Sequence, residues 1–450
     1  MSASSTAPEV RPAASVCVVG SGPSGLYAVD AVARKRPDAA IDVIDRLPTP
    51  FGLVRAGVAP DHLGTKNIVR QFDRALSRPG VRFLGNVTVG RDVSLDELKA
   101  GYDAVILAVG APVDRPLGVA GEDLAAVYGS GAFVGWYNGH PDHAALEPRL
   151  PGPSVAVVGN GNVALDIARI LAKTPKEMAE SDICAHAAKV IEAAPITDIH
   201  VIGRRGPVEA SFTSAELGEL GHLSRARPVV DATVLDGLTT ESEDDPRARK
   251  VKDKNLEILR AFAARPDAGE PVRIHLHFHA APREVLNDGS GAAGGLRLER
   301  TRVENGRAVG TGETFDLPAT TAVTAIGYRC AAVPGLRMDE NRGIVANDDG
   351  RVEPGVYVTG WARRGPSGVI PTNRTDAMAV AGHVLADLEE VESAKPGPAA
   401  LDTLLAERGA RPVCYDDWKR IDAAEVARAA QGRPREKFVR VEEMLAALDG

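Results

Sequence analysis

Short apolar runs alternate with helical and polar stretches along most of the chain. The first run, 16–19, ends at a glycine and is followed by a helical pattern from Ser24 to about Lys35. Similar runs predict strands at 40–45, 104–109, 154–158, 199–202, 322–326 and 356–359. Strands that alternate with helices are typical of parallel sheets, so the pattern predicts an α/β fold. We also expect helices after about Leu401.

A glycine-rich turn separates the first predicted strand from its helix. Gly20, Gly22 and Gly25 have the spacing of the dinucleotide-binding fingerprint, in which glycines permit a tight turn and let the backbone approach a pyrophosphate. The start of the helix would then face the phosphates. Asp45 closes the second predicted strand, where a carboxylate can accept hydrogen bonds from an adenosine ribose. The sequence therefore predicts a first dinucleotide site.

A second turn of the same kind follows a later strand. It contains Gly159 and Gly161, with Ala164 at the third glycine position, a variant that the fingerprint admits. The next predicted strand ends in Arg204 and Arg205, whose guanidinium groups suit a 2′-phosphate in charge and geometry. Because an acidic residue there would repel that phosphate, the second site is predicted to select NADP over NAD.

Several segments are interpreted as connections. The unusual length between the second turn and the arginines predicts an inserted helical excursion over 175–194. The acidic stretch 241–245 and the proline-containing stretch 392–398 are interpreted as solvated connections. Residues 1–15 lack the features of a signal peptide, and no apolar run reaches membrane-spanning length. We therefore expect a short disordered lead-in to a cytoplasmic enzyme without membrane insertion.

Composition and charge exclude several functions. The 450 residues are 44% hydrophobic and 25% charged, an ordinary composition for two or three domains. The net charge of −8 gives no indication of nucleic acid as a partner. The four cysteines are far apart, which leaves no disulfide framework, no redox pair and no cluster for an iron–sulfur centre. Redox chemistry would therefore require a bound organic cofactor.

Three alternating histidines raise the question of a metal site. His275, His277 and His279 would share one face of a strand. No carboxylate or cysteine completes a ligand set nearby in the sequence. We interpret the histidines as the polar face of a strand and predict no metal.

Five segments in order along the chain point to a known family. They cover 20–25, 50–62, 159–166, 203–213 and 360–370. On these segments the chain resembles the adrenodoxin reductase-like ferredoxin–NADP reductases, flavoproteins related in architecture to glutathione reductase. The resemblance implies two Rossmann-like dinucleotide-binding domains, FAD in the first and NADP(H) in the second, with the NADP domain inserted into the FAD domain. It also implies an iron–sulfur ferredoxin as electron acceptor.

The resemblance carries site residues over to this chain. It implies FAD contacts at Gly20, Gly22, Ser24, Gly25, Asp45, Leu53, Val89, Trp361, Gly368, Val369 and Ile370. It implies NADP contacts at Gly159, Asn160, Gly161, Asn162, Val163, Arg204, Arg205, Glu216 and, again, Gly368.

The resemblance also places two candidate catalytic residues, His62 and Glu219, close to the nicotinamide. An acid–base pair there would relay protons or orient the ring. Without the resemblance, His62 would instead be interpreted as a turn residue and Glu219 as a charge on a helix surface. Arg363 and Arg364 flank the flavin segment and are candidates for receiving an acidic partner.

For the domains, we expect an FAD domain built from 15–111 and from 334–450, the latter with a helical extension, and an NADP domain over 112–333. Short connections at Gly110 and Gly327 would carry any rotation between them. A monomer is favoured. Two other functions remain open at this point: an FAD- and NADPH-dependent monooxygenase, and an electron-relay subunit of a larger complex. A disulfide reductase is disfavoured because the flavin would need a nearby cysteine pair.

Overall fold

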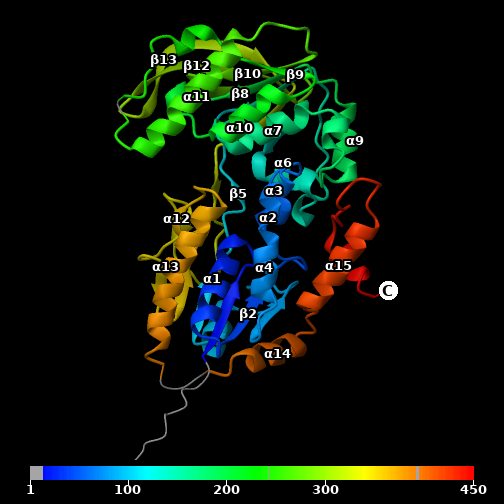
Figure 1. Ribbon diagram of the computed structural model, residues 1–450, viewed down its shortest axis with the longest axis vertical. Helices are drawn as coiled ribbons and strands as arrows, with labels where there is room; N and C mark the ends of the chain where they lie inside the picture. Colours follow the sequence, from blue (N-terminus) through cyan, green and yellow to red (C-terminus); the bar gives the residue numbers. More distant parts are fainter. Residues whose placement is uncertain (1–13, 242, 392–394, 450) are drawn as a thin grey trace, which may run out of the picture.

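The computed structural model of the chain describes residues 14–241, 243–391 and 395–449. These residues form two lobes, each built around a six-stranded sheet (Figure 1). The predicted α/β class is confirmed, with parallel pairing in nine of the ten strand pairs of these two sheets.

The first sheet combines strands from both ends of the chain. Its order is β18-β19-β4-β1-β2-β3, and only β18 runs antiparallel to its neighbour. The strands are β1 (Ser15–Val19), β2 (Ala40–Ile44), β3 (Val81–Leu84), β4 (Ala104–Leu107), β18 (Arg351–Glu353) and β19 (Val356–Val358). Helices α1 (Pro23–Lys35) and α13 (Ile370–Leu388) pack side by side against this sheet, as Figure 1 shows. The fully buried pattern of β1 follows from helices or loops covering both faces.

The second sheet uses strands that lie between β4 and β18 in the chain. Its order is β6-β14-β7-β8-β10-β9, parallel throughout. The strands are β6 (Val127–Gly129), β7 (Ser154–Val158), β8 (Asp198–Ile202), β9 (Ala226–Val229), β10 (Val272–His277) and β14 (Thr321–Thr324). Helices α7 (Asn162–Ala172) and α11 (Pro246–Ala264) share an apolar core with one face.

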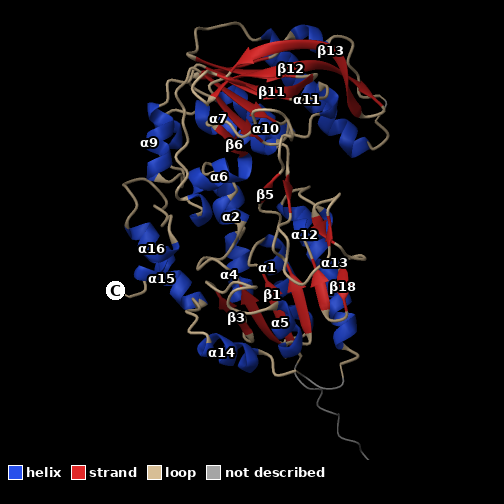
Figure 2. Ribbon diagram, turned by 180° about the vertical axis from the view of Figure 1, so that it is seen from behind, coloured by secondary structure: helices blue, strands red, loops and turns tan. Residues whose placement is uncertain are grey.

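A three-stranded antiparallel sheet covers the other face of the second sheet (Figure 2). It consists of β11 (Ala280–Asn287), β12 (Ala293–Glu304) and β13 (Arg307–Pro318). Leu296 and Leu298 of β12 pack with Ala156 and Ile202 of the parallel sheet. The second lobe therefore has three layers: helices, a parallel sheet and an antiparallel sheet.

A short ribbon joins the two lobes. Strand β5 (Val113–Asp114) pairs antiparallel with β15 (Tyr328–Arg329), and the ribbon lies between the lobes in both views (Figures 1 and 2). Gly110 and Gly327 precede these strands and have φ angles of 71° and 102°. The two passages of the chain between the sheets therefore lie side by side.

The remaining helices connect these layers. They are α2 (Leu53–Ala56), α3 (Leu63–Lys66), α4 (Val69–Leu76), α5 (Leu95–Gly101), α6 (Ser130–Asn138), α8 (Pro175–Met178), α9 (Ala185–Ala193), α10 (Ser214–Glu219) and α12 (Trp361–Arg364). A short hairpin joins β16 (Met338–Asp339) to β17 (Ile344–Val345). As predicted, the chain ends in helices: α14 (Pro398–Glu407), α15 (Tyr415–Ala427) and α16 (Val441–Ala446).

Most of the predicted elements are confirmed, with local differences. The excursion over 175–194 forms α8 and α9. The expected strand 322–326 ends at Thr324, because Ala325 and Ile326 already belong to the turn toward Gly327. The predicted lead-in over 1–15 is too long, since Ser15 already belongs to β1. Its first 13 residues lie outside the described part of the chain. Residues 242 and 392–394 of the two predicted connections also lie outside it. Within the described ranges, no helix is long and apolar enough to span a membrane.

Candidate functional site

The first glycine-rich turn joins β1 to α1 at the carboxyl edge of the first sheet, where parallel α/β sheets bind their ligands. Gly20 has a φ angle of 105°, and a Cβ atom there would lie 2.5 Å from the carbonyl oxygen of Ala108. At Gly25, a Cβ atom would lie 2.0 Å from the carbonyl oxygen of Gly20. The turn is therefore compatible only with glycine at these positions, and its backbone is left bare at the start of α1.

Two other predicted segments pack directly on this turn. A Cβ atom at Gly52 would lie 2.9 Å from Cα of Gly22, and one at Gly360 would lie 2.2 Å from Oγ of Ser24. Leu53 and Trp361 follow these two glycines. The structure thus brings together three segments that are far apart in the sequence.

Asp45 lies beside the same turn. Its Oδ2 accepts hydrogen bonds from the backbone N–H of Ser21 (2.9 Å) and from its hydroxyl (2.5 Å), and its Oδ1 accepts one from the N–H of Leu47 (3.0 Å). These bonds fix the carboxylate at the end of β2. Oδ1, which accepts only one of these bonds, keeps capacity for a further donor.

In the segments around this turn, two apolar side chains are exposed and one aromatic side chain has a polar atom without a hydrogen-bond partner among the described residues. Leu53 is 47% exposed and Val369, just before α13, is 52% exposed. The indole Nε1 of Trp361 is buried and has no hydrogen-bond partner among the described residues. Its ring stacks on Tyr328 of β15, with centroids 5.9 Å apart. A flat aromatic ligand with hydrogen-bonding groups would satisfy these side chains, so they fit a flavin.

The other predicted flavin contacts are more peripheral. Val89 is partly buried against the apolar cluster on the second face of the first sheet. Gly368 lies immediately before Val369, and Ile370 begins α13. The 368–370 segment therefore presents the amino-terminal end of a long helix, a position that favours an anionic or polar group.

The second turn lies at the carboxyl end of β7 and is held by the segment after β8. Asn160 O accepts hydrogen bonds from the N–H and the hydroxyl of Ser211 (2.9 and 3.0 Å). The side chain of Asn162 accepts a bond from the N–H of Thr213 (2.8 Å). Gly159, Gly161 and Val163 complete the turn, which leads into α7. It has the same relation to its sheet as the first turn.

Arg204 and Arg205 follow β8 at the same edge of the second sheet. They line an open pocket of about 410 Å³. Neither guanidinium forms an ion pair within the described ranges. This is the environment expected for a phosphate-binding site.

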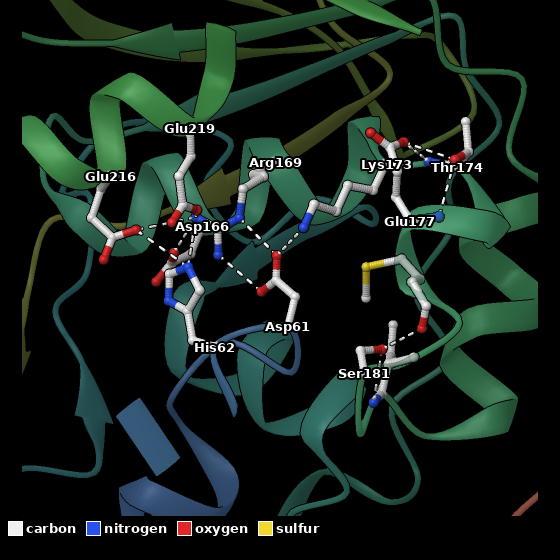
Figure 3. Close-up of polar contacts among 12 residues, drawn as sticks. Asp61, His62, Asp166, Arg169, Lys173, Thr174, Glu177, Ser181, Glu216 and Glu219 are labelled. Carbon is white, nitrogen blue, oxygen red and sulfur yellow. Dashed lines mark hydrogen bonds and ion pairs between the residues drawn. The ribbon is translucent and has the colours of Figure 1, made fainter. Parts of the chain in front are cut away.

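His62 and Glu219, which come from different lobes, are in contact. His62 Nε2 lies 3.0 Å from Oε2 of Glu219 and 3.6 Å from Oε2 of Glu216 (Figure 3). His62 precedes α3 of the first lobe, whereas both glutamates belong to α10 of the second. The pair predicted from the sequence is therefore adjacent in space, where the two lobes meet.

Arg169 is the centre of the network around this pair. Its Nη1 lies 3.2 Å from Glu216, 3.1 Å from Glu219 and 2.8 Å from Asp166. Although its side chain is only 1% exposed, it also forms a bidentate pair with Asp61, at 2.9 and 3.0 Å. Because Asp61 precedes His62, Arg169 fixes the loop that carries the histidine (Figure 3).

The carboxyl groups of this network have shifted pKa values. Burial, and then the charge of Asp166, raises the pKa of Glu216. Burial also raises the pKa of Asp166. For Asp61, burial is outweighed by Arg169 and by Lys173, whose Nζ is 2.6 Å away, so its pKa lies well below the usual range. The cluster can therefore hold a proton on its inner carboxyls while Asp61 stays ionised.

The sequence did not suggest that His62, Glu216 and Glu219 would form a group with metal-ligand geometry. One ligand atom from each lies within 4.8 Å of the others. However, the guanidinium of Arg169 already contacts both carboxylates. It supplies the positive charge that a metal would bring, so we interpret the group as an ion-pair cluster.

The interpretation of the three alternating histidines needs correction. His275 and His277 do share a face of β10, where they pack with His200 of β8; His200 Nδ1 lies 2.9 Å from Nε2 of His277. Burial lowers the pKa of His200 to about 3 and that of His277 to about 4. His279 lies beyond the strand, at a φ angle of 55°, and packs against Gly206.

Arg363 and Arg364 are not free to receive a partner, contrary to our hypothesis. Arg363 pairs with Asp376 of α13 (2.5 Å) and with Asp349. Arg364 donates to the side chain of Asn373 (2.5 Å). Both arginines therefore hold α12 against α13.

Sequence reasoning missed Arg169, Asp166, Asp61 and Tyr328. One signal was available: α7 is apolar except for Asn162, Asp166 and Arg169, and the last two are three positions apart. Charged residues in an otherwise buried helix need partners, so their presence indicates a polar network. Their partners could not be identified because Asp61, Glu216 and Glu219 come from segments remote in sequence, and Asp61 from the other lobe.

Comparison with known proteins agrees with this geometry. Residues 14–204 match the family described as pyridine nucleotide-disulphide oxidoreductase. The chain is 41% identical to the mitochondrial NADPH:adrenodoxin oxidoreductase of Homo sapiens, an alignment covering 96% of this chain and 91% of that protein. It is 40% identical to the NADPH-ferredoxin reductase FprA of Mycobacterium tuberculosis, with coverage of 96% and 98%.

A solved structure extends the similarity to the fold. The structure of Mycobacterium tuberculosis FprA in complex with NADPH superposes with a TM-score of 0.93 and 39% identity, covering 97% of this chain and all of that one. Nearly the whole chain is thus aligned with these relatives in both sequence and structure. The chain therefore belongs to the family of adrenodoxin reductase-type NADPH–ferredoxin reductases.

Proposed function

We propose that this protein is an FAD-dependent reductase that passes electrons from NADPH to a ferredoxin-type iron–sulfur protein. The observation that carries the proposal is the meeting of His62 from the first lobe with Glu219 from the second, between two dinucleotide turns at the carboxyl edges of two parallel sheets. This arrangement supports two dinucleotide sites whose ligands would meet where the lobes join.

FAD fits the first turn. Gly20, Gly22 and Gly25 leave the backbone open to a pyrophosphate, and Asp45 is placed for a ribose. The exposed side chain of Leu53, and the Nε1 of Trp361, which has no hydrogen-bond partner in the described part of the chain, would contact the flavin. When bound, FAD accepts a hydride from NADPH and releases electrons singly.

The residues around the second turn support selection of NADPH. Arg204 and Arg205 offer two guanidinium groups without ion pairs to described residues at the end of β8, the position at which this fold reads the 2′ substituent of the ribose. The turn from Gly159 to Val163 receives the pyrophosphate at the start of α7. Glu216, beside His62, would lie at the nicotinamide end of the site.

His62 and Glu219 act as the catalytic pair in this proposal. Their hydrogen bond orients the imidazole, and Arg169 holds both the loop of His62 and the carboxylate of Glu219. The pair can therefore position the reacting ring and hold a proton near it without moving either lobe.

The finer organisation is also part of the proposal. An FAD domain would comprise 15–111 and 334–450, with the NADP domain over 112–333 between them. We further propose a monomer in the cytoplasm. The relatives are described as mitochondrial in eukaryotes, so fractionation of the source cells decides the compartment.

The decisive experiment is reduction of cytochrome c by the purified protein with a panel of ferredoxins. We expect a yellow protein with one FAD per chain and a rate that depends on NADPH and on added ferredoxin. NADH serves as the matched control nucleotide. A colourless folded protein that cannot take up FAD would contradict the proposal.

The same assay separates the other two functions. A monooxygenase would consume NADPH with oxygen alone and hydroxylate an added substrate. A relay subunit would show negligible reduction of artificial acceptors when purified by itself. Neither outcome is expected, because the aligned relatives are named as NADPH reductases of adrenodoxin or ferredoxin.

A further inference from the structure

A third arginine lies in the pocket that contains Arg204 and Arg205. Besides these two residues, the pocket is lined by Gly306, Arg307 and Ala308. The latter three come from the hairpin between β12 and β13, which belongs to the antiparallel layer and not to the nucleotide-binding sheet. The strand-turn-helix fingerprint therefore gives no indication of this arginine.

The hairpin holds Arg307 in a defined place. Its two turn residues, Asn305 and Gly306, have φ angles of 50° and 72°, as in the tight turns that suit a twisted antiparallel pair. Glu304 and Arg307 face each other as the last ladder pair before the turn. Arg307 is thus the first residue of β13, set by the register of the hairpin.

The hairpin is also bound to the loop that carries the two arginines. The hydroxyl of Thr301 donates to the carbonyl oxygen of Arg204 (2.7 Å), and the N–H of His279 donates to that of Arg205 (3.0 Å). The N–H of Thr301 donates in turn to His279 O (2.9 Å). These bonds tie β12 to the arginine loop, so the relative position of the three arginines is built into the lobe.

The charges in the pocket are uncompensated. No carboxylate lines it, and none of the three guanidinium groups forms an ion pair with any residue that the structure describes. Glu304, the residue opposite Arg307, instead pairs with Arg302. Three neighbouring cations without a counter-ion repel one another unless an anion binds between them, and a phosphate dianion matches this charge.

We propose that Arg307 is a specificity-determining residue that binds the 2′-phosphate of NADPH together with Arg204 and Arg205. This inference rests on the proposed function, because it concerns the nucleotide of the second site. It adds that the preference for NADPH depends on the antiparallel layer as well as on the strand β8. A hairpin with an apolar or acidic residue at 307 would discriminate less between NADPH and NADH.

The test compares Arg307→Ala and Arg307→Lys with the parent protein. Binding of 2′,5′-ADP and of 5′-AMP is measured by calorimetry on the FAD-loaded enzyme. Arg307→Ala should weaken binding of 2′,5′-ADP by about 3- to 10-fold, the size of one exposed charge-assisted hydrogen bond, and leave 5′-AMP unchanged. Arg307→Lys should retain part of the affinity, since it keeps the charge without the planar fork. KM for NADPH should follow the same order, and KM for NADH should not.

Arg297→Ala is the matched control. Arg297 lies on β12 of the same layer but pairs with Glu284 and Asp316 and does not line the pocket. Its loss removes one positive charge and should leave both ligands unaffected. An equal loss of 2′,5′-ADP affinity in Arg297→Ala and Arg307→Ala would show a long-range charge effect and overturn the proposal.

A further variant separates this inference from the proposed function. Arg204→Ala with Arg205→Ala should abolish the preference for 2′,5′-ADP over 5′-AMP. If that double variant loses the preference while Arg307→Ala keeps it, the role of Arg307 is refuted and NADPH selection at this pocket stands. If the double variant also keeps the preference, the pocket does not read the phosphate and both are refuted.

Discussion

Arg55 and Glu425 form a bidentate ion pair that joins helix α2 to helix α15 near the carboxyl terminus. The two bonds are 2.9 and 2.5 Å long, and the side chain of Glu425 is fully buried. Glu425 also accepts a bond from the N–H of Phe438 (2.9 Å), and Arg55 lies over the ring of Trp418. The carboxyl-terminal extension is therefore fixed beside the flavin site and is not a loose appendage.

Glu425→Gln should strongly destabilise the protein, because it leaves the guanidinium of Arg55 buried without a counter-charge. The expected loss is about 3–5 kcal/mol, as for other broken buried pairs. Urea denaturation with FAD fluorescence as a second signal measures it. Asp422→Asn, on the same helix but partly exposed, is the control and should cost far less. Similar losses in both variants would show that burial of the pair is not the cause.

The same pair should contribute to acid sensitivity. Burial raises the pKa of Glu425, but the charge and hydrogen bonds of Arg55 outweigh it, so the net shift is downward. Because the folded-state pKa lies below the unfolded one, the pair contributes its full stabilisation above about pH 4.3. That contribution is lost as the pH falls through the folded-state pKa.

A second buried cluster makes stability depend on pH in the neutral to alkaline range. Lys66 and Lys437 share the carboxylate of Asp182, at 2.6 and 3.1 Å. Burial, and next the charge of Lys437, lowers the pKa of Lys66 to about 7. The unfolded chain keeps this lysine protonated to about pH 10.4, so it binds more protons than the folded chain between pH 7 and that value. Stability from this group therefore rises with pH across that window.

Lys66→Met should remove this rise. The variant leaves Asp182 paired with Lys437 alone, one charge against one. Thermal unfolding at a series of pH values should show the largest gain in stability over the parent protein below pH 7. The gain should become smaller as the pH rises above 7. A gain that is independent of pH would mean that Lys66 is not the titrating group.

Asp182→Asn should destabilise the fold, because it leaves two buried lysines without a counter-charge. Because Lys66 belongs to the first lobe, Asp182 to the second and Lys437 to the carboxyl-terminal segment, the loss should loosen all three. We expect a destabilisation of about 3–5 kcal/mol and faster proteolysis near residue 437. Asp416→Asn, the same kind of substitution at an exposed ion pair with Lys419 on α15, serves as control.

His62→Gln and Glu219→Gln test the catalytic pair. Both variants keep hydrogen-bonding groups of similar size, and neither residue contacts the first turn, so FAD content should be unchanged. Stopped-flow reduction of the flavin by NADPH should slow by roughly 10²-fold or less in each, the range of general acid–base assistance. The double variant should be little slower than either single one. Parental rates in both would return these residues to a structural role.

Two glycines of the first turn should behave differently. A Cβ atom at Gly25 would lie 2.0 Å from a carbonyl oxygen, whereas one at Gly22 would meet nothing closer than 3.9 Å. Gly25→Ala should therefore fold poorly. Gly22→Ala should fold normally but bind FAD more weakly, since the methyl group lies where the pyrophosphate approaches. Circular dichroism and flavin content measure the two effects separately.

The fold was largely predictable because its strands are short apolar runs that end in glycine or polar residues. The turn after Val19 and that after Val158 are local features, so spacing alone identified them. Strand ends were less certain: the apolar Ala325 and Ile326 leave the sheet because the chain must turn toward Gly327. The antiparallel layer β11–β13 was not predicted, because its strands lack a sharp apolar alternation; β13 is mostly exposed.

The site was predictable only where its residues belong to local motifs. Gly20, Asp45 and Arg204 follow strands at set distances, and a pattern can find them. Arg169 and Arg307 reach the sites through contacts between elements remote in sequence. Such contacts depend on tertiary packing, which spacing along one chain does not contain.

The ribbon of β5 and β15 brings together the two points at which the chain enters and leaves the second lobe. Its entry and exit strands are hydrogen-bonded neighbours, with Asp114 opposite Tyr328 and Val113 opposite Arg329. Excising everything between them would leave two ends about one strand spacing apart, a gap that a tight two-residue turn closes. Domain insertion of this kind tolerates exchange, because few covalent constraints cross the boundary. A different lobe grafted at the ribbon would therefore connect easily through the backbone, but it would also have to supply partners for Asp61 and Lys66, which pair with Arg169 and Asp182 of the present lobe.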